Sequence, residues 1–184
     1  MKKIVLWISL ILLCTGCTNQ GDTSGNEKAI SAQLNRLFNS YAKSGENLYD
    51  RPVPQGLFTD TLKTLLEKAV KTSEDDMERV KNSEYPDDKP LLLEGSVFTS
   101  LYEGFTSYRI RKIMINNVSK DKAESIVEFQ NAAFAPKAVW TDHVLLVKDS
   151  GGWKIDNIIF GDNPDLKDLR SSLENFIAEA RQPQ

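Results

Sequence analysis

The chain has 184 residues, a formal net charge of −3 and 40% hydrophobic residues, with two cysteines. That length suits one domain with a sizeable hydrophobic core. The mildly acidic balance excludes nucleic acid as an expected partner, because nucleic-acid-binding surfaces concentrate Lys and Arg. It also excludes a broad basic face for anionic lipid.

The first sixteen residues have the organisation of a targeting segment. Lys2 and Lys3 precede a ten-residue, mainly apolar stretch from Ile4 to Leu13. Ten residues are too few to span a bilayer, but they match the apolar core of a signal peptide. We therefore expect residues 1–16 to be a signal peptide that is removed from the mature protein.

The run Leu13-Cys14-Thr15-Gly16-Cys17 resembles the lipobox of bacterial lipoproteins, with Cys14 where that motif usually has Leu. The resemblance implies cleavage before Cys17 and acylation of its thiol, and two or more acyl chains hold a protein durably on a membrane. The alternative is ordinary secretion, with cleavage near Gly16 and a free thiol. In lipoprotein sorting like that of enterobacteria, Asp after the acylated cysteine favours retention in the inner membrane. Thr18 at this position therefore favours the outer membrane. We expect a lipid-anchored protein of the bacterial envelope that faces the periplasm.

The mature chain is expected to begin with a short tether. Removing residues 1–16 from 184 leaves 168 residues and takes away two lysines, so the net charge becomes −5. Cys17 is then the sole cysteine, which excludes an internal disulfide even in an oxidising compartment. Residues 18–26 (TNQGDTSGN) contain no apolar side chain. We predict a lipidated cysteine and flexible tether at residues 17–26, followed by one domain at residues 27–181.

The first half of this domain has helical periodicity. Apolar residues at three- and four-residue steps predict a first helix with a core-facing stripe of Ile30, Leu34, Leu37, Phe38 and Tyr41. A second helix is expected from Leu57 or Phe58 to about Asn82, with Ser73 capping a restart within it. The loop from Glu84 to Pro90 that follows is acidic and bracketed by prolines.

The second half changes to the alternation of strands. Four strands are expected, at residues 108–116, 122–131, 139–148 and 153–160. Residues 149–152 (DSGG) predict a tight hairpin turn between the last two strands. Asn163-Pro164 predicts the cap of a final helix. Helices separated along the chain from an antiparallel sheet define an α+β fold.

Two stretches of the domain resemble the nuclear transport factor two-like superfamily, which has a cone-shaped fold. Residues 151–158 (GGWKIDNI) are similar to its last hairpin, in which a Trp follows the turn. Residues 88–104 (DKPLLLEGSVFTSLYEG) resemble a branch of small bacterial envelope proteins and lipoproteins, whose members often carry an acidic residue where this chain has Ser96. The resemblance implies N-terminal helices packed in a curved, mostly antiparallel sheet of four or more strands, with an additional C-terminal helix.

Catalytic candidates are few. Enzymes of this superfamily handle protons with a His or Tyr beside an Asp inside the cone, which draws attention to His143, the sole histidine, and to Asp142. Neighbours on a strand point to opposite faces, so these two are not expected to share a cavity. Asp156 is a further titratable candidate. We expect no enzymatic activity.

Metal and cofactor sites are also not expected. Glu84, Asp87 and Asp88 form an acidic cluster, but it lacks the alternating ligands and the pivot glycine of a calcium loop. The sequence also lacks a Gly-rich phosphate loop and metal-spaced Cys or His residues. A solvated loop is the interpretation that we favour.

The strand from Val139 has two substantially apolar faces, whereas a strand with one wet face alternates cleanly. One face covers the helices, and the other meets the C-terminal helix, a second copy or a partner. Our candidates for a partner surface are Trp140, Asp142, Glu84, Asp87 and Asp88.

Three functions remain open. The first is a non-enzymatic, Cys17-anchored lipoprotein that binds another protein, as an accessory of an envelope complex or an immunity-type binder, or that forms a homodimer. The second is a carrier or sensor for a small hydrophobic ligand, with a cone cavity lined by Tyr108, Phe129 and Trp153. The third, an isomerase- or hydrolase-like enzyme, requires His143 or Asp156 to face that cavity.

Overall fold

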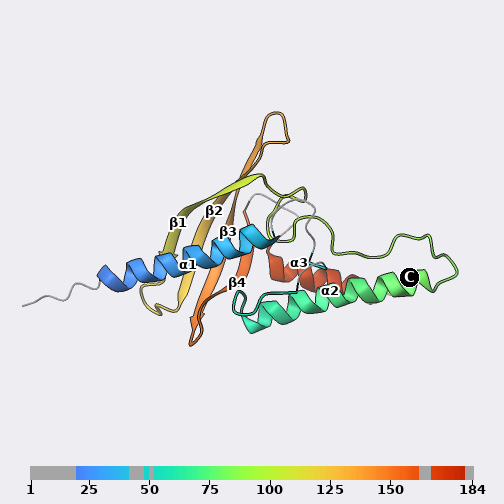
Figure 1. The fold of residues 1–184 in the computed structure, drawn as a ribbon, viewed down its shortest axis with the longest axis horizontal. Coiled ribbons are helices and arrows are strands. Elements are labelled where there is room, and N and C mark those ends of the chain that lie inside the picture. The colour runs from blue at the N-terminus through green and yellow to red at the C-terminus, as the bar shows by residue number, and fades with distance from the viewer. Residues whose placement is uncertain (1–19, 42–47, 50–51, 162–166, 181–184) are drawn as a thin grey trace, which may run out of the picture.

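Two helices precede a four-stranded sheet and a third follows it in the computed structural model, which describes residues 20–41, 48–49, 52–161 and 167–180. The elements are α1 (Gln20–Tyr41), α2 (Asp60–Lys81), β1 (Ser107–Ile115), β2 (Lys122–Asn131), β3 (Ala138–Asp149), β4 (Gly152–Phe160) and α3 (Leu169–Glu179). The predicted α+β class is confirmed. In Figure 1, α1 crosses the sheet, whereas α2 and α3 run side by side beyond β4.

The sheet is an antiparallel meander in the order β1-β2-β3-β4. Each predicted strand lies within one residue of its observed bounds at either end. The predicted hairpin turn is confirmed, because Asp149 pairs with Gly152 and the Gly151 N–H donates to Asp149 Oδ1 at 2.8 Å. Gly152 has φ +106°, a conformation that side chains disfavour.

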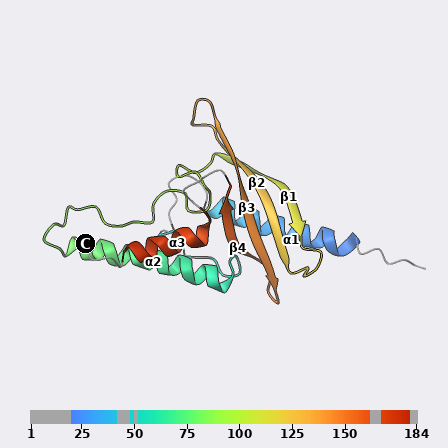
Figure 2. The same ribbon diagram turned by 180° about the vertical axis from the view of Figure 1, so that it is seen from behind.

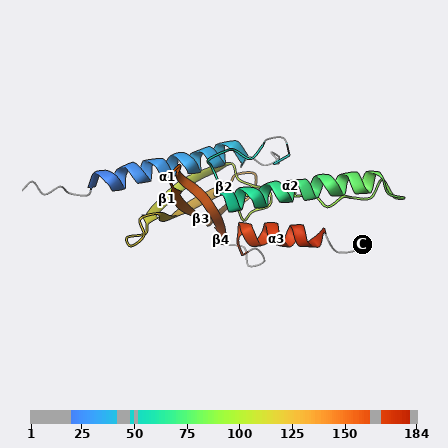
Figure 3. The ribbon, with the colours of Figure 1, turned by 90° about the horizontal axis from the view of Figure 1, so that it is seen from below.

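α1 supplies the layer that covers one face of the sheet (Figure 3). Its predicted apolar stripe is confirmed, since all five of its side chains are at most 4% exposed. Phe38 is the central contact, with its ring centroid 5.1 Å from those of both Tyr108 and Phe129. Ring pairs at this distance add to the stabilisation that burial of apolar area provides.

α1 begins at Gln20, so the prediction of a flexible tether is wrong for residues 20–26. Asn26 is fixed to the domain, because its Oδ1 accepts hydrogen bonds from Trp153 Nε1 at 3.0 Å and from Lys148 Nζ at 2.9 Å. The absence of apolar residues in this segment reflects a solvent-facing turn of helix, in which Thr23, Ser24 and Gly25 are exposed. A helix already formed extends at little cost, because each added residue gains a backbone hydrogen bond.

α2 starts later than predicted, at Asp60, with Thr59 as its cap. The residues just before it continue the sheet instead. The Thr59 N–H donates to Ile155 O and the Ile155 N–H donates to Leu57 O, both at 2.9 Å. These bonds hold the start of α2 against β4.

The predicted restart within α2 does not occur, and the helix runs unbroken through Ser73. Ser73 and Asp76 bind the chain that follows the helix. Ser73 Oγ accepts from the Leu93 N–H at 3.0 Å, and Asp76 Oδ2 accepts from the Leu91 N–H at 2.6 Å. The side chains that suggested a cap therefore anchor the irregular segment that returns along α2.

α3 begins at Leu169 with Asp168 as its cap, later in the chain than the cap predicted at Asn163-Pro164. That pair itself lies outside the described residues. Asp168 Oδ1 accepts from the Ser171 N–H at 3.0 Å. The apolar side of α3 is buried through Leu169, Leu173 and Ile177.

The position of Gly25 offers a test of the extended α1. A Cβ at this exposed helical residue meets no atom within 4 Å. Gly25→Ala is expected to raise the free energy of unfolding by about 0.5–1 kcal/mol, because Gly is a poor helix former. The measurement is urea denaturation, with Gly56→Ala as the control, since φ +72° at Gly56 makes that substitution destabilising. No change in Gly25→Ala would show that residues 20–26 are not part of a stable helix.

Asp76 makes stability depend on pH. Arg79 Nε donates to Asp76 Oδ1 at 2.7 Å and, with the Leu91 N–H, lowers the pKa of Asp76 despite its burial. Asp76→Asn should therefore lower the free energy of unfolding by about 1–3 kcal/mol at pH 7. A carboxylate with a lowered folded pKa stabilises above the ordinary Asp pKa of about 3.9 and loses that effect as the pH falls through its folded pKa. Denaturation at pH 7 and at about pH 2 should show the difference shrinking, and a difference independent of pH would contradict this assignment.

Candidate functional site

The face of the sheet that α1 covers is filled with side chains, which argues against the predicted cavity. Phe129 is fully buried and Trp153 is 2% exposed. Tyr108 packs among Phe38, Phe105 and Phe129, and burial raises the pKa of its hydroxyl. Phe129 and Trp153 are therefore core residues, and Tyr108 is a half-buried residue packed against the core. They do not line an open ligand cavity.

Trp140 and Asp142 also belong to the interior, so their assignment to a partner surface is wrong. Trp140 is 6% exposed and stacks on Phe129 at 5.6 Å, and Asp142 is fully buried. Asp142 accepts from Thr99 Oγ1 at 2.8 Å, from the Ser100 N–H at 2.9 Å and from the Gly161 N–H at 3.2 Å. The carboxylate is an internal acceptor that ties the segment after α2 to the sheet.

The acidic loop after α2 is exposed at Glu84, Asp87 and Asp88. In the described part of the chain, no group of three or more His, Cys, Asp or Glu side chains is placed to hold a metal ion. Figure 1 places this loop at the end of the molecule opposite to the start of α1. The loop is therefore a solvated tip that lies far from the sheet.

His143 and Asp142 lie on opposite faces of β3, as predicted. Asp142 faces the core, whereas the His143 side chain is 38% exposed and its Nδ1 lies 2.5 Å from Glu124 Oε1. The buried Asp142 carboxylate already accepts hydrogen bonds from the three donors described above. The two side chains thus form no proton-transferring pair.

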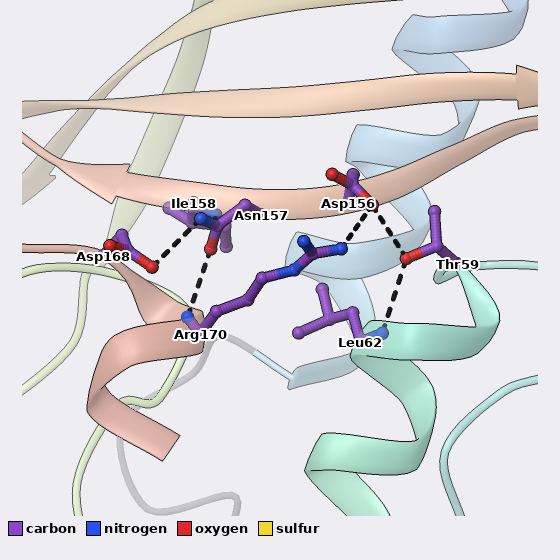
Figure 4. Close-up of polar contacts among 7 residues, drawn as sticks. All are labelled: Thr59, Leu62, Asp156, Asn157, Ile158, Asp168 and Arg170. Carbon is purple, nitrogen blue, oxygen red and sulfur yellow. Dashed lines mark hydrogen bonds and ion pairs between the residues drawn. The ribbon is translucent and has the colours of Figure 1, made fainter. Parts of the chain in front are cut away.

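Asp156, the other catalytic candidate, is a structural link at a β-bulge. Leu145 pairs with Asn157 and Leu146 pairs with Ile155, which leaves Asp156 as the extra residue of β4. Its Oδ1 accepts from Thr59 Oγ1 at 3.0 Å and from Arg170 Nη2 at 2.5 Å (Figure 4). One carboxylate thus joins the first turns of α2 and α3 to the sheet.

Asn157 completes this junction. Its Nδ2 donates to Asp168 Oδ1 at 3.0 Å and its Oδ1 accepts from the Arg170 N–H at 3.1 Å (Figure 4). Burial alone would raise the pKa of Asp168, but the hydrogen bonds from Ser171 and Asn157 outweigh burial and lower it. The junction therefore keeps Asp168 ionised as the cap of α3.

The opposite face of the sheet, which we call the outer face, is the surface that the fold leaves open. Viewed from behind in Figure 2, the strands lie in front of α1, and none of the described helices covers β1 to β3. Ile126 pairs with His143, and His143 pairs with Ile159, across three adjacent strands. The outer face comprises Glu124, Ile126, Glu128, Val139, Thr141, His143, Leu145, Val147 and Ile159, all of them partly or fully exposed.

The outer face has an apolar centre around His143, with the Arg111–Glu128 ion pair beside it. Ile126, Leu145 and Ile159 lie on neighbouring strands around His143. Arg111 Nη2 contacts Glu128 Oε2 at 2.5 Å, in addition to the pair of His143 with Glu124. An apolar centre with a polar rim is the usual anatomy of a protein interface.

The edges of the sheet are less suited to pairing with another strand. β1 has a register shift between Ile110 and Lys112, and Arg109, Arg111 and Lys112 are exposed along it. Bulges and charges of this kind block the addition of a strand. The outer edge of β4 is partly covered, because Phe58 and Asp168 form isolated β-bridges with it. A partner of the sheet is therefore expected to meet its face.

Sequence reasoning separated the two faces of β3 correctly but chose the wrong one as the surface. Asp142 looked like a surface residue because an isolated charge is rarely buried. The sequence offered one signal, the hydroxyl of Thr99, which donates to Asp142. The second donor is the backbone N–H of Ser100, which the residue type does not indicate.

Comparisons of the chain with protein-family models, with curated proteins and with solved structures find no match. None of the helices within the described ranges combines the length and apolar character that crossing a bilayer requires. The proposed signal peptide and Cys17 lie outside the described residues.

The role of Asp142 can be tested against its neighbour on the other face. Asp142→Ala leaves three inward-facing donors without their acceptor and should lower the free energy of unfolding by about 3 kcal/mol. His143→Ala removes only a partly exposed pair and should cost less than about 1 kcal/mol. Urea denaturation of both variants measures the difference. Equal effects would show that Asp142 is not the buried acceptor described here.

Proposed function

We propose that this protein is a lipid-anchored component of the bacterial envelope that binds another protein through the outer face of its sheet, without catalysis. The observation that carries the proposal is the division of the sheet into two faces. One face is covered by α1 and the aromatic core, whereas the other combines partly exposed apolar side chains with the Arg111–Glu128 ion pair and the His143–Glu124 contact. A face of that composition suits protein recognition.

The anchor is supported by the sequence around Cys17. The lipobox-like run implies acyl chains on this residue, and α1 starts only three positions later, at Gln20. A helix of 22 residues is about 33 Å long. The N-terminal end of α1 and the acidic tip at Glu84 to Asp88 lie at opposite ends of the molecule in Figure 1. An anchor at Cys17 would thus hold the acidic tip away from the membrane and leave the sheet accessible between them.

Membership of the cone-fold superfamily is part of the same proposal. It is supported by the element order, by a helix that packs on one face of an antiparallel meander, and by Trp153, which follows the hairpin turn and is buried. Curvature of the sheet around α1 is the geometry that this membership requires.

A site-specific photo-crosslinker in cells tests the proposal on the full-length, Cys17-anchored chain. Placed at Val139 or Thr141, it should yield one dominant adduct, because both side chains belong to the outer face. Placed at Tyr85 in the acidic loop or at Val118 in the β1–β2 turn, which are 63% and 95% exposed, it should yield none. Leu145→Lys should abolish the adduct at Val139, because it places a charge in the apolar centre.

Further controls separate the parts of the proposal. Cys17→Ala should remove the adduct if recognition requires the anchor. An adduct of twice the mass of the chain would identify the partner as a second copy. Adducts from Tyr85 or Val118 alone, or an adduct at Val139 that Leu145→Lys leaves unchanged, would contradict recognition through the outer face.

A further inference from the structure

A pocket with a volume of about 330 Å³ opens between residues 93–103 and the first turns of α3. That volume lies at the lower end of the range for small-molecule sites, which are mostly apolar with a few polar groups. Its apolar walls comprise Leu93, Val97, Leu101, Phe160, Leu169 and Leu173. The pocket is separate from the outer face of the sheet.

Both walls of this pocket are fixed by bonds within the protein. Thr99 and Ser100 are held by the buried carboxylate of Asp142. The loop is closed on itself, because the Ser96 N–H donates to Tyr102 O at 2.8 Å. On the other side, α3 is held by the junction at β4. A preformed pocket spares a ligand the cost of ordering its site.

The charge around the pocket has a single sign. Glu94 and Glu103 are among its lining residues, which include no Lys, Arg or His. Glu94 is already paired with Lys89 Nζ at 3.1 Å, whereas exposed Glu103 has no ion-pair partner among the described residues. The rim thus favours a cation and disfavours a carboxylate ligand.

We propose that this pocket binds a small amphiphilic amine. The apolar body of the ligand packs against Leu101 and Leu173, and its ammonium group pairs with the Glu103 carboxylate at the rim. This site is independent of the protein partner proposed above, and it differs from the filled interior around Phe129.

Three probes with one apolar body and different head groups test the proposal: phenylbutylamine, phenylbutanol and phenylbutanoate. Their dissociation constants are measured by ligand-observed NMR on the full chain in nanodiscs of neutral lipid, with empty nanodiscs subtracted. The amine should bind tightest and the carboxylate weakest. Glu103→Arg should weaken amine binding about fivefold and make the carboxylate the better ligand, because an exposed ion pair is reversed in sign.

Val118→Arg is the matched control, since it adds the same charge at an exposed turn outside the pocket and should leave all three constants unchanged. Leu173→Trp, checked for folding by circular dichroism, should abolish binding of all three probes by filling the pocket. Since Glu103 is exposed, Glu103→Arg remains informative if Leu173→Trp does not fold. Equal affinity for the three head groups, or an order that Glu103→Arg does not change, would overturn the proposal.

Discussion

The arrangement of the helices depends on the hydrogen bonds and ion pair that attach them to β4, the last strand of the sheet. The bulge at Asp156 allows one carboxylate to bind Thr59 at the start of α2 and Arg170 at the start of α3. On the same strand, Trp153 Nε1 donates to Asn26, and Trp153 O accepts from Gln33 Nε2 at 2.7 Å, both in α1. All three helices are therefore positioned by side chains and backbone groups of a single nine-residue strand.

This attachment determines which surfaces remain available. Because α2 and α3 are bound at the edge of β4, they extend beyond the sheet and leave its outer face open, while α1 fills the opposite face (Figures 2 and 3). The same attachment places α3 beside the 93–103 segment, and the pocket forms between them. A single junction thus accounts for both the proposed protein-binding face and the proposed ligand pocket.

Local sequence pattern was enough for the strands, the hairpin turn and the buried stripe of α1, because periodicity and turn chemistry are read from neighbouring residues. Local pattern failed where a residue distant in sequence determines a helix cap or the burial of a side chain. Thr59 caps α2 because Leu57 pairs with Ile155, and Asp168 caps α3 because Asn157 binds it. Asp142 is buried because Thr99 and Ser100, more than forty positions away in sequence, supply donors. Two apolar faces on β3 gave no local means of choosing the one that faces inward.

Carbene footprinting of the full-length protein tests the central claim, that the outer face is open in the isolated chain and covered by a partner in the envelope. Labelling is compared between the purified protein and the protein in its native membranes. The account predicts that Val139, Leu145 and Ile126 are labelled when purified and protected in membranes, while Tyr85 and Val118 are labelled equally in both. Equal labelling of the outer face in the two preparations would contradict it.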